Sequence, residues 1–485
     1  MKKEASANSY RSILKGTSVF GGVQIFNILI NLVRGKFVAV ILGPEGMGIS
    51  SLFTSTSTTI QRFASLGLNQ VIVREIAMTT DDPSTNDKIY ATIKYLIKVT
   101  ALLGLLVCIL FCVPLSRVTF GSESYAWQFV LLGLAVALSI AANAKLSILQ
   151  GLHQIKKISK SSIIGGLTGL IIGVPLYYIW GDKGIVPAIV AVALALYIFF
   201  SINLRKCGAK VSRKYTWKEK FPVMKRLILL GGVLMASDLI GSLMTYLINI
   251  FLRIHGSIDD VGLYQAANSV TNQYAGLVFA AMAMDYFPRL SKVVNDNRMM
   301  VEVVNRQTEI VSLLIAPAMC LLILTAPLVI RVLLSESFFT ITPLMRWMGL
   351  GILLKALSFP MGYIAFAKGN KKVFFILEGI TGNLLYLILG CLGFYFFGLI
   401  GLGYALVLEN VIILLIYYIV NSLLYSYNFS REALLLFYGA VIIGLCCFVS
   451  SCFAHAALSY SLMGIITMGS LVLSFFQLKK KLSRS

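Results

Sequence analysis

The hydrophobic residues of this chain are arranged in runs of about 20, separated by short polar or glycine-rich stretches. A helix of that length spans about 30 Å, the thickness of the hydrocarbon core of a bilayer. The runs do not alternate between apolar and polar residues, so they indicate helices and not the strands of a barrel. We therefore expect an all-α membrane protein with about 14 transmembrane helices.

Glycine-rich or polar turns at 43–46, 180–184 and 369–372 separate several of these runs. The predicted spans lie at about 16–38, 47–72, 92–114, 126–149, 161–180, 184–204, 227–251, 262–286, 308–331, 343–366, 373–397, 400–425, 432–453 and 457–477.

Composition agrees with this pattern and excludes a soluble fold. Of the 485 residues, 58% are hydrophobic and 13% are charged, whereas soluble domains carry about 25% charged residues. The first run follows a basic tail but is too long for a signal peptide and shows no small-residue cleavage site, so we interpret it as a retained helix. Seven of the eight cysteines lie in apolar spans, which argues against a disulfide or zinc framework.

The distribution of the 42 Lys and Arg residues predicts the orientation in the membrane. Most fall in tails and loops on one side, which the positive-inside rule assigns to the cytoplasm together with both termini. The densest cluster, residues 205–226, is interpreted as a topology anchor that contacts anionic headgroups. The same rule accounts for the net charge of +22, so no nucleic-acid partner is expected.

Weak internal similarity predicts two pseudo-symmetric halves. Gly21-Gly22 recurs as Gly231-Gly232 and Gly184-Ile185 as Gly398-Leu399, at offsets of about 210–214 residues. Chance recurrence of glycine at loops is the competing explanation. The expected organisation is an N-terminal six-helix lobe (1–204), a basic cytoplasmic linker loop (205–226), a second six-helix lobe (227–425), and a further helix pair with a basic cytoplasmic tail (426–485).

Polar residues follow one face of several predicted helices, where lipid contact would require apolar ones. The first predicted helix carries Asn27, Asn31 and Arg34, and the second carries Thr58 and Arg62 among several serines. The repeat relation maps the polar face of the second helix onto Asn268 and Asn272 in the other half. We interpret these faces as lining a hydrated cleft between two bundles. Helix packing through Ser and Thr hydrogen bonds is the alternative, although it does not require Arg62.

Ionisable residues at membrane depth are costly and are therefore functional candidates. Arg62 and Lys355 are candidate cations for an anionic substrate group. Asp238 and Glu409 are candidates for a proton or sodium site, or for ion pairs with these cations. Glu378 is a further candidate for an ion site or a salt bridge, but it lies nearer a helix end, where snorkelling to the interface is the expected behaviour.

Enzyme signatures are missing from the sequence. The three histidines are scattered without metal-ligand spacing, and no phosphate-binding Gly-Lys-Ser/Thr loop is present. We expect no catalytic residues, no metal and no cofactor. Energy would come from a proton or sodium gradient, the membrane potential, or the concentration of the substrate.

Several strings, taken in their order and spacing, resemble the multidrug/oligosaccharidyl-lipid/polysaccharide (MOP) exporter superfamily, most closely Wzx-type O-antigen translocases and lipid III flippases. They are Arg34-Gly35-Lys36, Gly43-Pro44-Glu45-Gly46-Met47-Gly48, Val261-Gly262-Leu263-Tyr264-Gln265, Phe287-Pro288-Arg289-Leu290-Ser291, Leu333-Leu334-Ser335, Trp347 to Lys355, and Gly362 to Lys368.

This resemblance implies a MATE-like, V-shaped pair of lobes in the bacterial inner membrane, with alternating access. It further implies a flippase for an O-antigen or similar polysaccharide repeat unit on undecaprenyl pyrophosphate, moved to the periplasmic leaflet, with Arg62 and Lys355 near the pyrophosphate or acidic sugars. Membrane lipids and the polysaccharide polymerase machinery are the expected partners. The two spans after residue 430 depart from the twelve-helix translocases.

Two alternatives lead to different expectations. A cation-coupled multidrug exporter of the same superfamily would need an acidic ion site in a lobe cavity, and the polar face of the first half offers Arg62 but no carboxylate at depth. A glycan polymerase or ligase would need large periplasmic loops, whereas every predicted outer loop is short.

Overall fold

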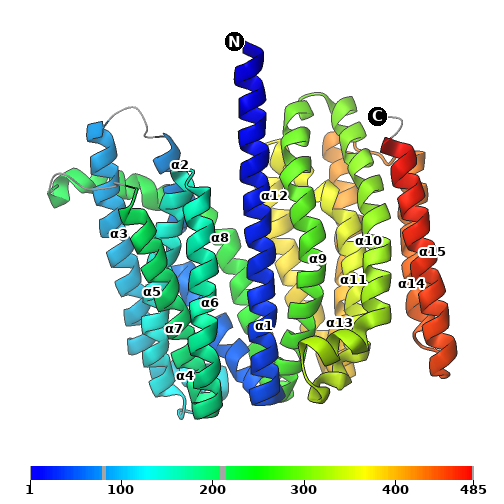
Figure 1. The fold of residues 1–485 in the computed structure, drawn as a ribbon, viewed down its shortest axis with the longest axis horizontal. Coiled ribbons are helices and arrows are strands. Elements are labelled where there is room, and N and C mark those ends of the chain that lie inside the picture. Colours follow the sequence, from blue (N-terminus) through cyan, green and yellow to red (C-terminus); the bar gives the residue numbers. More distant parts are fainter. Residues whose placement is uncertain (1, 79–82, 208–214, 483–485) are drawn as a thin grey trace. The chain divides into compact units, whose positions relative to one another are not determined.

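The described part of the protein is helical throughout. The computed structural model describes residues 2–78, 83–207 and 215–482, in which helices and no strands are found (Figure 1). Within these residues, nine helical segments are long and apolar enough to cross a bilayer. Ile155–Arg205 and Lys371–Tyr425 each contain two predicted spans, and Phe26–Ala64 contains parts of two. The all-α membrane class is confirmed, whereas the exact number of crossings stays a prediction.

The chain forms two compact units, Met1–Ile254 and His255–Ser485. The elements of the first are α1 (Lys2–Ala64), α2 (Leu68–Met78), α3 (Pro83–Leu110), α4 (Cys112–Phe120), α5 (Ala126–Gly151), α6 (Ile155–Trp180), η1 (Gly181–Gly184), α7 (Ile185–Arg205) and α8 (Trp217–His255). Those of the second are α9 (Ile258–Val293), α10 (Asn297–Leu333), η2 (Glu336–Ile341), α11 (Thr342–Ala367), α12 (Lys371–Phe374), the π-helical η3 (Phe375–Thr381), α13 (Gly382–Tyr425), α14 (Arg431–Ser450) and α15 (Ala456–Leu482).

The unit boundary falls one span later than the predicted lobe boundary. Helix α8, predicted to open the second lobe, bonds to the first unit: the Thr59 hydroxyl donates to the carbonyl of Ser242 at 3.1 Å, and the hydroxyls of Thr119 and Tyr246 lie 2.8 Å apart. Part of the predicted basic linker, residues 208–214, lies outside the described residues. The V-shaped arrangement of lobes concerns the placement of one unit against the other and stays a prediction.

Two glycines break long helices between predicted spans. Gly43 has non-helical backbone angles inside α1, with φ 67° and ψ −164°. Gly398, with φ 61° and ψ −148°, divides α13 in the same way, and Gly393 and Gly401 then approach so closely that a Cβ on either would overlap the backbone of the other. Because only glycine adopts such angles readily, each break separates two predicted spans.

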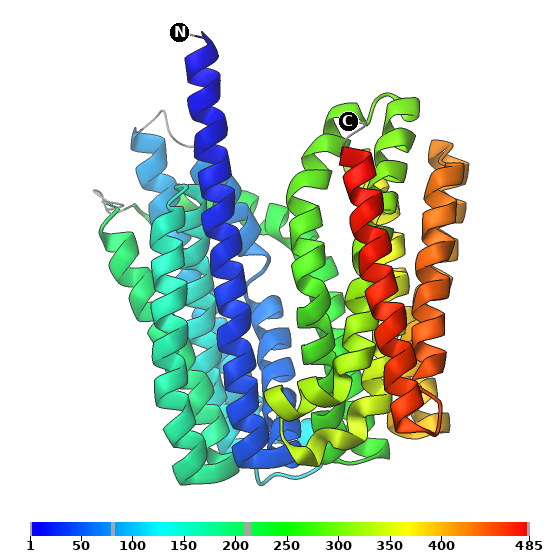
Figure 2. The ribbon, with the colours of Figure 1, turned by 45° about the vertical axis from the view of Figure 1, so that its right-hand side comes forward.

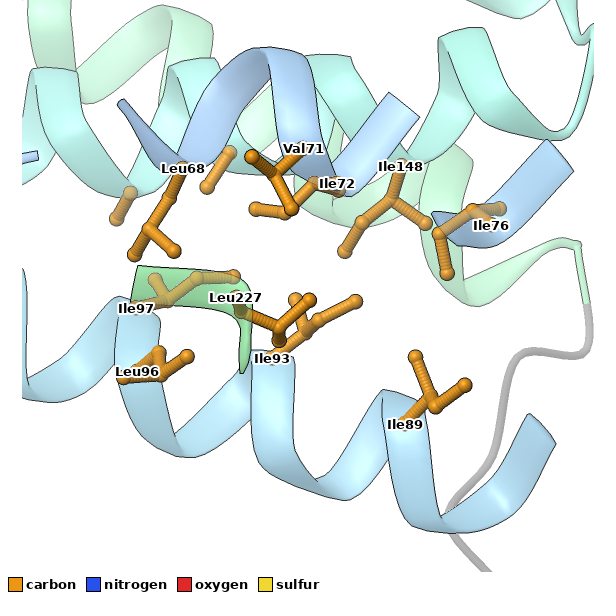
Figure 3. Packing of buried hydrophobic residues seen from close by; sticks show 12 residues of the cluster. Leu68, Val71, Ile72, Ile76, Ile89, Ile93, Leu96, Ile97, Ile148 and Leu227 are labelled. Atoms are coloured by element: carbon orange, nitrogen blue, oxygen red, sulfur yellow. The ribbon is translucent and has the colours of Figure 1, made fainter. Parts of the chain in front are cut away.

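The second predicted span ends earlier than expected. Helix α1 stops at Ala64, the chain turns through Leu66 and Gly67, both with positive φ, and α2 begins at Leu68. Figure 3 shows the apolar face of α2 against α3, α5 and the start of α8. This cluster of buried residues comprises Leu68, Val71, Ile72, Ile76, Ile89, Ile93, Leu96, Ile97, Ala141, Ala144, Ile148 and Leu227.

The turn before α2 packs directly on α8. A Cβ at Gly67 would overlap the carbonyl oxygen of Gly231, and a Cβ at Gly231 would overlap that of Leu66. The contact therefore needs glycine on both sides. Asp238 follows Gly231 by two helical turns and thus lies on a similar face of α8, which places its carboxylate beside the end of α1.

We expect Gly67→Ala to destabilise the first unit. At position 67 an alanine would be strained by the positive φ of 66° and would also overlap the carbonyl of Gly231. Gly369→Ala is the control, because it has a similar φ of 68° but its Cβ would have no described atom within 4 Å. The difference should be about 1–3 kcal/mol, the usual cost of overpacking. Thermal melting of both purified variants measures it, and equal melting temperatures would contradict the close contact.

In the second unit, α11 and the latter part of α13 run in parallel with a constant register. A Cβ at Gly403 would contact Trp347, one at Gly351 would contact Leu406, and one at Gly362 would contact Tyr417. Parallel neighbours require an intervening segment that crosses in the opposite direction, and the stretch before Gly398 supplies it. This register places Lys355 of α11 level with Glu409 of α13.

The last two helices pack on the second unit. Helices α14 and α15 contact each other and α10, and lie side by side in both views (Figures 1 and 2). The Lys481 ammonium pairs with the Glu309 carboxylate of α10 and lies 3.5 Å from that of Glu432. The additional helix pair is therefore attached to α10 by charge as well as by apolar contact.

Candidate functional site

A polar pocket of about 270 Å³ opens within the first unit. One wall comes from the end of α1 and the following turn, and the other from α5. Its lining is dominated by hydroxyl and amide side chains with one cation, and consists of Thr58, Gln61, Arg62, Ser65, Asn69, Ile140, Asn143, Leu146, Ser147 and Gln150. Such a lining offers many hydrogen-bond donors and acceptors of the kind that hydroxyl-rich ligands require.

Arg62 is held at this pocket by its position in the helix and by a carboxylate. It lies in the last turn of α1, where a cation is favoured by the helix dipole. Its guanidinium Nη1 donates to Asp238 Oδ2 at 3.0 Å, and the amide of Gln70 donates to the same oxygen at 3.4 Å. Asp238 thus accepts hydrogen bonds from two elements that border the pocket.

The Arg62–Asp238 pair contributes little to stability by itself. The side chains are 48% and 42% exposed, and pairs of this exposure are worth about 0–1 kcal/mol. Both groups are therefore accessible for exchange with another charged partner. Of the two roles expected for Asp238, an ion site or an ion pair with one of the cations, the structure shows the ion pair with Arg62. Helix α8, and not the first 204 residues, thus brings a carboxylate to this polar face.

The α5 wall was missed in the sequence. Asn143, Ser147 and Gln150 line the pocket and follow one another at i, i+4 and i+7, the spacing of one helical face. That spacing could have been recognised within an otherwise apolar span. It was overlooked because serine and asparagine also occur in ordinary helix packing.

The polar residues of the first part of α1 lie apart from this pocket. The Arg34 Nε donates to the Tyr177 hydroxyl of α6 at 3.4 Å. Asn31 is exposed and Asn27 is half-buried. None of the three is among the residues that line the pocket, so the structure divides the predicted set of first-unit residues in two.

A second set of predicted residues meets in the second unit. Lys355 is exposed although its neighbours on α11, Leu354 and Ala356, are buried, and it interacts electrostatically with Glu409 of α13. Beside Glu409, the hydroxyls of Tyr264 and Tyr386 share a hydrogen bond of 2.7 Å. This arrangement combines one cation, one carboxylate and two phenols.

The remaining predicted residues take separate places. On α9, the amide of Asn272 donates to the amide oxygen of Asn268 at 2.6 Å. The Glu378 carboxylate in η3 accepts from the Tyr417 hydroxyl, while Asn383 donates to the carbonyl of Gly379 at 2.9 Å. Glu378 therefore has a local partner within the second unit. Among the described residues, no group of His, Cys, Asp or Glu could hold a metal ion.

A helical, multi-pass membrane chain with a polar pocket among its helices has the architecture of a transporter. The sequence matches the model of the family described as "Polysaccharide biosynthesis protein" over residues 13–294. The chain belongs to this family and, with it, to the MOP exporter superfamily, as its sequence predicts. It is a transporter and not an enzyme.

Curated relatives are flippases and transporters. The chain is 24% identical over 374 residues to the "Lipid III flippase" of Escherichia coli (strain K12), covering 76% of this chain and 88% of that protein. It is also 24% identical over 310 residues to a "Putative O-antigen transporter" of Shigella flexneri, covering 62% and 72% respectively.

Solved structures share the fold. A "Lipid II flippase MurJ, inward closed conformation" matches with a TM-score of 0.72 and 16% identity over 96% of this chain and 99% of that one. The MATE multidrug transporter DinF-BH matches with a TM-score of 0.61 and 19% identity, covering 87% and 96%. The MATE-like fold predicted from the sequence is thus confirmed.

Proposed function

We propose that this protein flips an undecaprenyl-pyrophosphate-linked oligosaccharide, an O-antigen or similar repeat unit, from the cytoplasmic to the periplasmic leaflet of a bacterial inner membrane. The observation that carries the proposal is the pocket in which Arg62 stands among hydroxyl and amide side chains. The names of the two curated relatives support the same class of substrate. Both termini are proposed to lie in the cytoplasm.

The chemistry of such a substrate fits the lining. A glycan headgroup cannot cross hydrocarbon without replacing its hydrogen bonds to water, and Gln61, Asn69, Asn143 and Gln150 supply amide donors and acceptors. The polyprenyl tail needs no such replacement and can stay in lipid. Alternating access then moves the headgroup without covalent chemistry, and we infer that an ion gradient or the membrane potential supplies the energy.

The Arg62–Asp238 pair gives this pocket a means of releasing its ligand. A diphosphate would accept bidentate hydrogen bonds from the Arg62 guanidinium and would displace the Asp238 carboxylate. Asp238 would keep its hydrogen bond from the Gln70 amide. When the phosphate leaves, the carboxylate returns. The competition keeps the pocket neutral when it is empty and limits how tightly substrate is held.

Asp238→Asn tests this competition. We expect the variant to bind labelled lipid-linked oligosaccharide up to about fivefold more tightly, because the substitution removes a charge competitor worth about 0–1 kcal/mol, and to flip it more slowly. Binding is measured by titration in detergent, and flipping by access of a membrane-impermeant glycosidase to substrate in proteoliposomes. Weaker binding than wild type would contradict competition.

A cation-coupled drug exporter is the second candidate, because Asp238 borders the first-unit pocket and the fold includes MATE multidrug transporters. Its carboxylate would have to be free for a cation, whereas here it is paired with Arg62. The same proteoliposomes discriminate the two functions. Gradient-driven uptake of a fluorescent organic cation, without movement of lipid-linked glycan, would overturn the flippase proposal.

A further inference from the structure

A second pocket of the first unit, of about 480 Å³, lies between α3, α5 and α7. Helix α5 packs against both α3 and α7 (Figure 1). Three cations line the pocket, Lys94 of α3, Lys145 of α5 and Arg205 at the end of α7. No carboxylate is among the described residues of its lining.

This pocket is separate from the one at Arg62. Helix α5 contributes to both, but through different faces: Asn143 and Ser147 line the Arg62 pocket, whereas Lys145 and Ile148 line this one. Successive residues of a helix are 100° apart, so these pairs point to different sides. A ligand here is not the headgroup that we place beside Arg62.

The charge at the centre of the pocket is fixed in position. The Lys145 ammonium donates to the Ser201 hydroxyl at 2.5 Å and lies 3.4 Å from the centre of the Tyr197 ring. These contacts orient the ammonium but leave its charge uncompensated. Together with Lys94 and Arg205 it makes a site of three like charges, whose mutual repulsion is relieved when an anion binds.

Apart from Tyr90, the remaining walls are apolar. Branched aliphatic side chains from all three helices face the same space as the cations. They are Ile97, Ile148, Ile198, Ile202 and Leu204. A ligand that satisfies both parts of the pocket carries a phosphate at one end and hydrocarbon at the other.

The position along the helices fits the same ligand. Lys145 lies two turns before the end of α5, and Arg205 is the last residue of α7. The distribution of Lys and Arg assigns these helix ends to the cytoplasmic side, where the leaflet is rich in anionic lipid. Basic pockets between transmembrane helices on that side bind phospholipid headgroups.

We propose that this pocket binds an anionic membrane phospholipid, with its phosphate held by Lys94, Lys145 and Arg205 and an acyl chain along the isoleucine wall. The site is independent of the proposed transport substrate. It makes the first unit more stable in anionic than in zwitterionic lipid. A free diphosphate would satisfy the cations but not the apolar wall.

The test uses the full-length protein purified in detergent. We add phosphatidylglycerol, phosphatidylcholine or inorganic pyrophosphate in separate samples. Native mass spectrometry counts the bound lipid, and thermal melting measures the stability of the protein in each sample. We expect phosphatidylglycerol to be retained and to raise the melting temperature. Retention should fall about fivefold in Lys94→Gln or Arg205→Gln and about 25-fold in the double variant. Both substituted side chains are exposed, so folding should survive.

Lys156→Gln is the matched control, because Lys156 is an exposed cation at the start of α6 that lines neither pocket. It should retain phosphatidylglycerol as wild type does. Equal retention of phosphatidylcholine, unchanged retention in the double variant, or full stabilisation by pyrophosphate alone would each overturn the lipid site. Transport activity is not needed for any of these measurements.

Discussion

Replacing Arg62 by alanine is expected to lower transport of lipid-linked oligosaccharide roughly 30- to 100-fold while the protein stays in the membrane. Truncating one partner of a charge pair that is buried on binding costs about 2–5 kcal/mol. The pair in question here is the one between Arg62 and the substrate diphosphate, and the 48% exposure of the free side chain favours the lower end. The pocket would then hold uncharged donors and the carboxylate of Asp238, which repels a diphosphate. The glycosidase-access assay in proteoliposomes measures the loss.

Two further variants make this result specific. Arg62→Lys keeps the charge but loses the planar fork, so it should recover part of the activity. Arg117→Ala removes another exposed arginine that is paired with a carboxylate, Glu123, away from the pocket, and should transport normally. Full transport by Arg62→Ala would remove Arg62 from the substrate site.

Replacing Lys355 by alanine is expected to lower transport roughly 10- to 30-fold, with a smaller effect on stability. Its ammonium is an exposed charge on a helix whose neighbouring residues are buried, which is a costly arrangement unless Glu409 or a ligand compensates the charge. The same transport assay, together with thermal melting of the purified variant, separates the two effects.

A double-mutant comparison distinguishes substrate binding from structural pairing at this position. If Lys355 only neutralises Glu409, the double variant Lys355→Ala with Glu409→Gln should regain both transport and melting temperature. If Lys355 contacts substrate, melting should recover and transport should not. Recovery of transport in the double variant would therefore contradict a binding role for Lys355.

Much of the architecture follows from local features of the sequence. Apolar runs of bilayer length form the helices. The predicted turns at Gly43, Gly181 and Gly369, and the gap between predicted spans at Gly398, all have glycine with positive φ. The chain reveals these features without tertiary information, because insertion in lipid depends on local hydrophobicity and glycine conformation depends on its own backbone. The break at 65–67 escaped prediction, because apolar residues continue on both sides of it.

Local features of the sequence did not determine which residues the site residues contact. Arg62, Asp238, Lys355 and Glu409 stand out by themselves as charges in apolar spans, so their candidacy, the helical class and the transporter family all come from the sequence. Only the tertiary structure decided that Arg62 meets Asp238, 176 positions away, through the backbone contact of Gly67 with Gly231. Hydrophobicity determines which segments enter a membrane but carries no information about neighbours, since lipid and apolar side chains are nearly equivalent surroundings; close packing and specific hydrogen bonds make that choice.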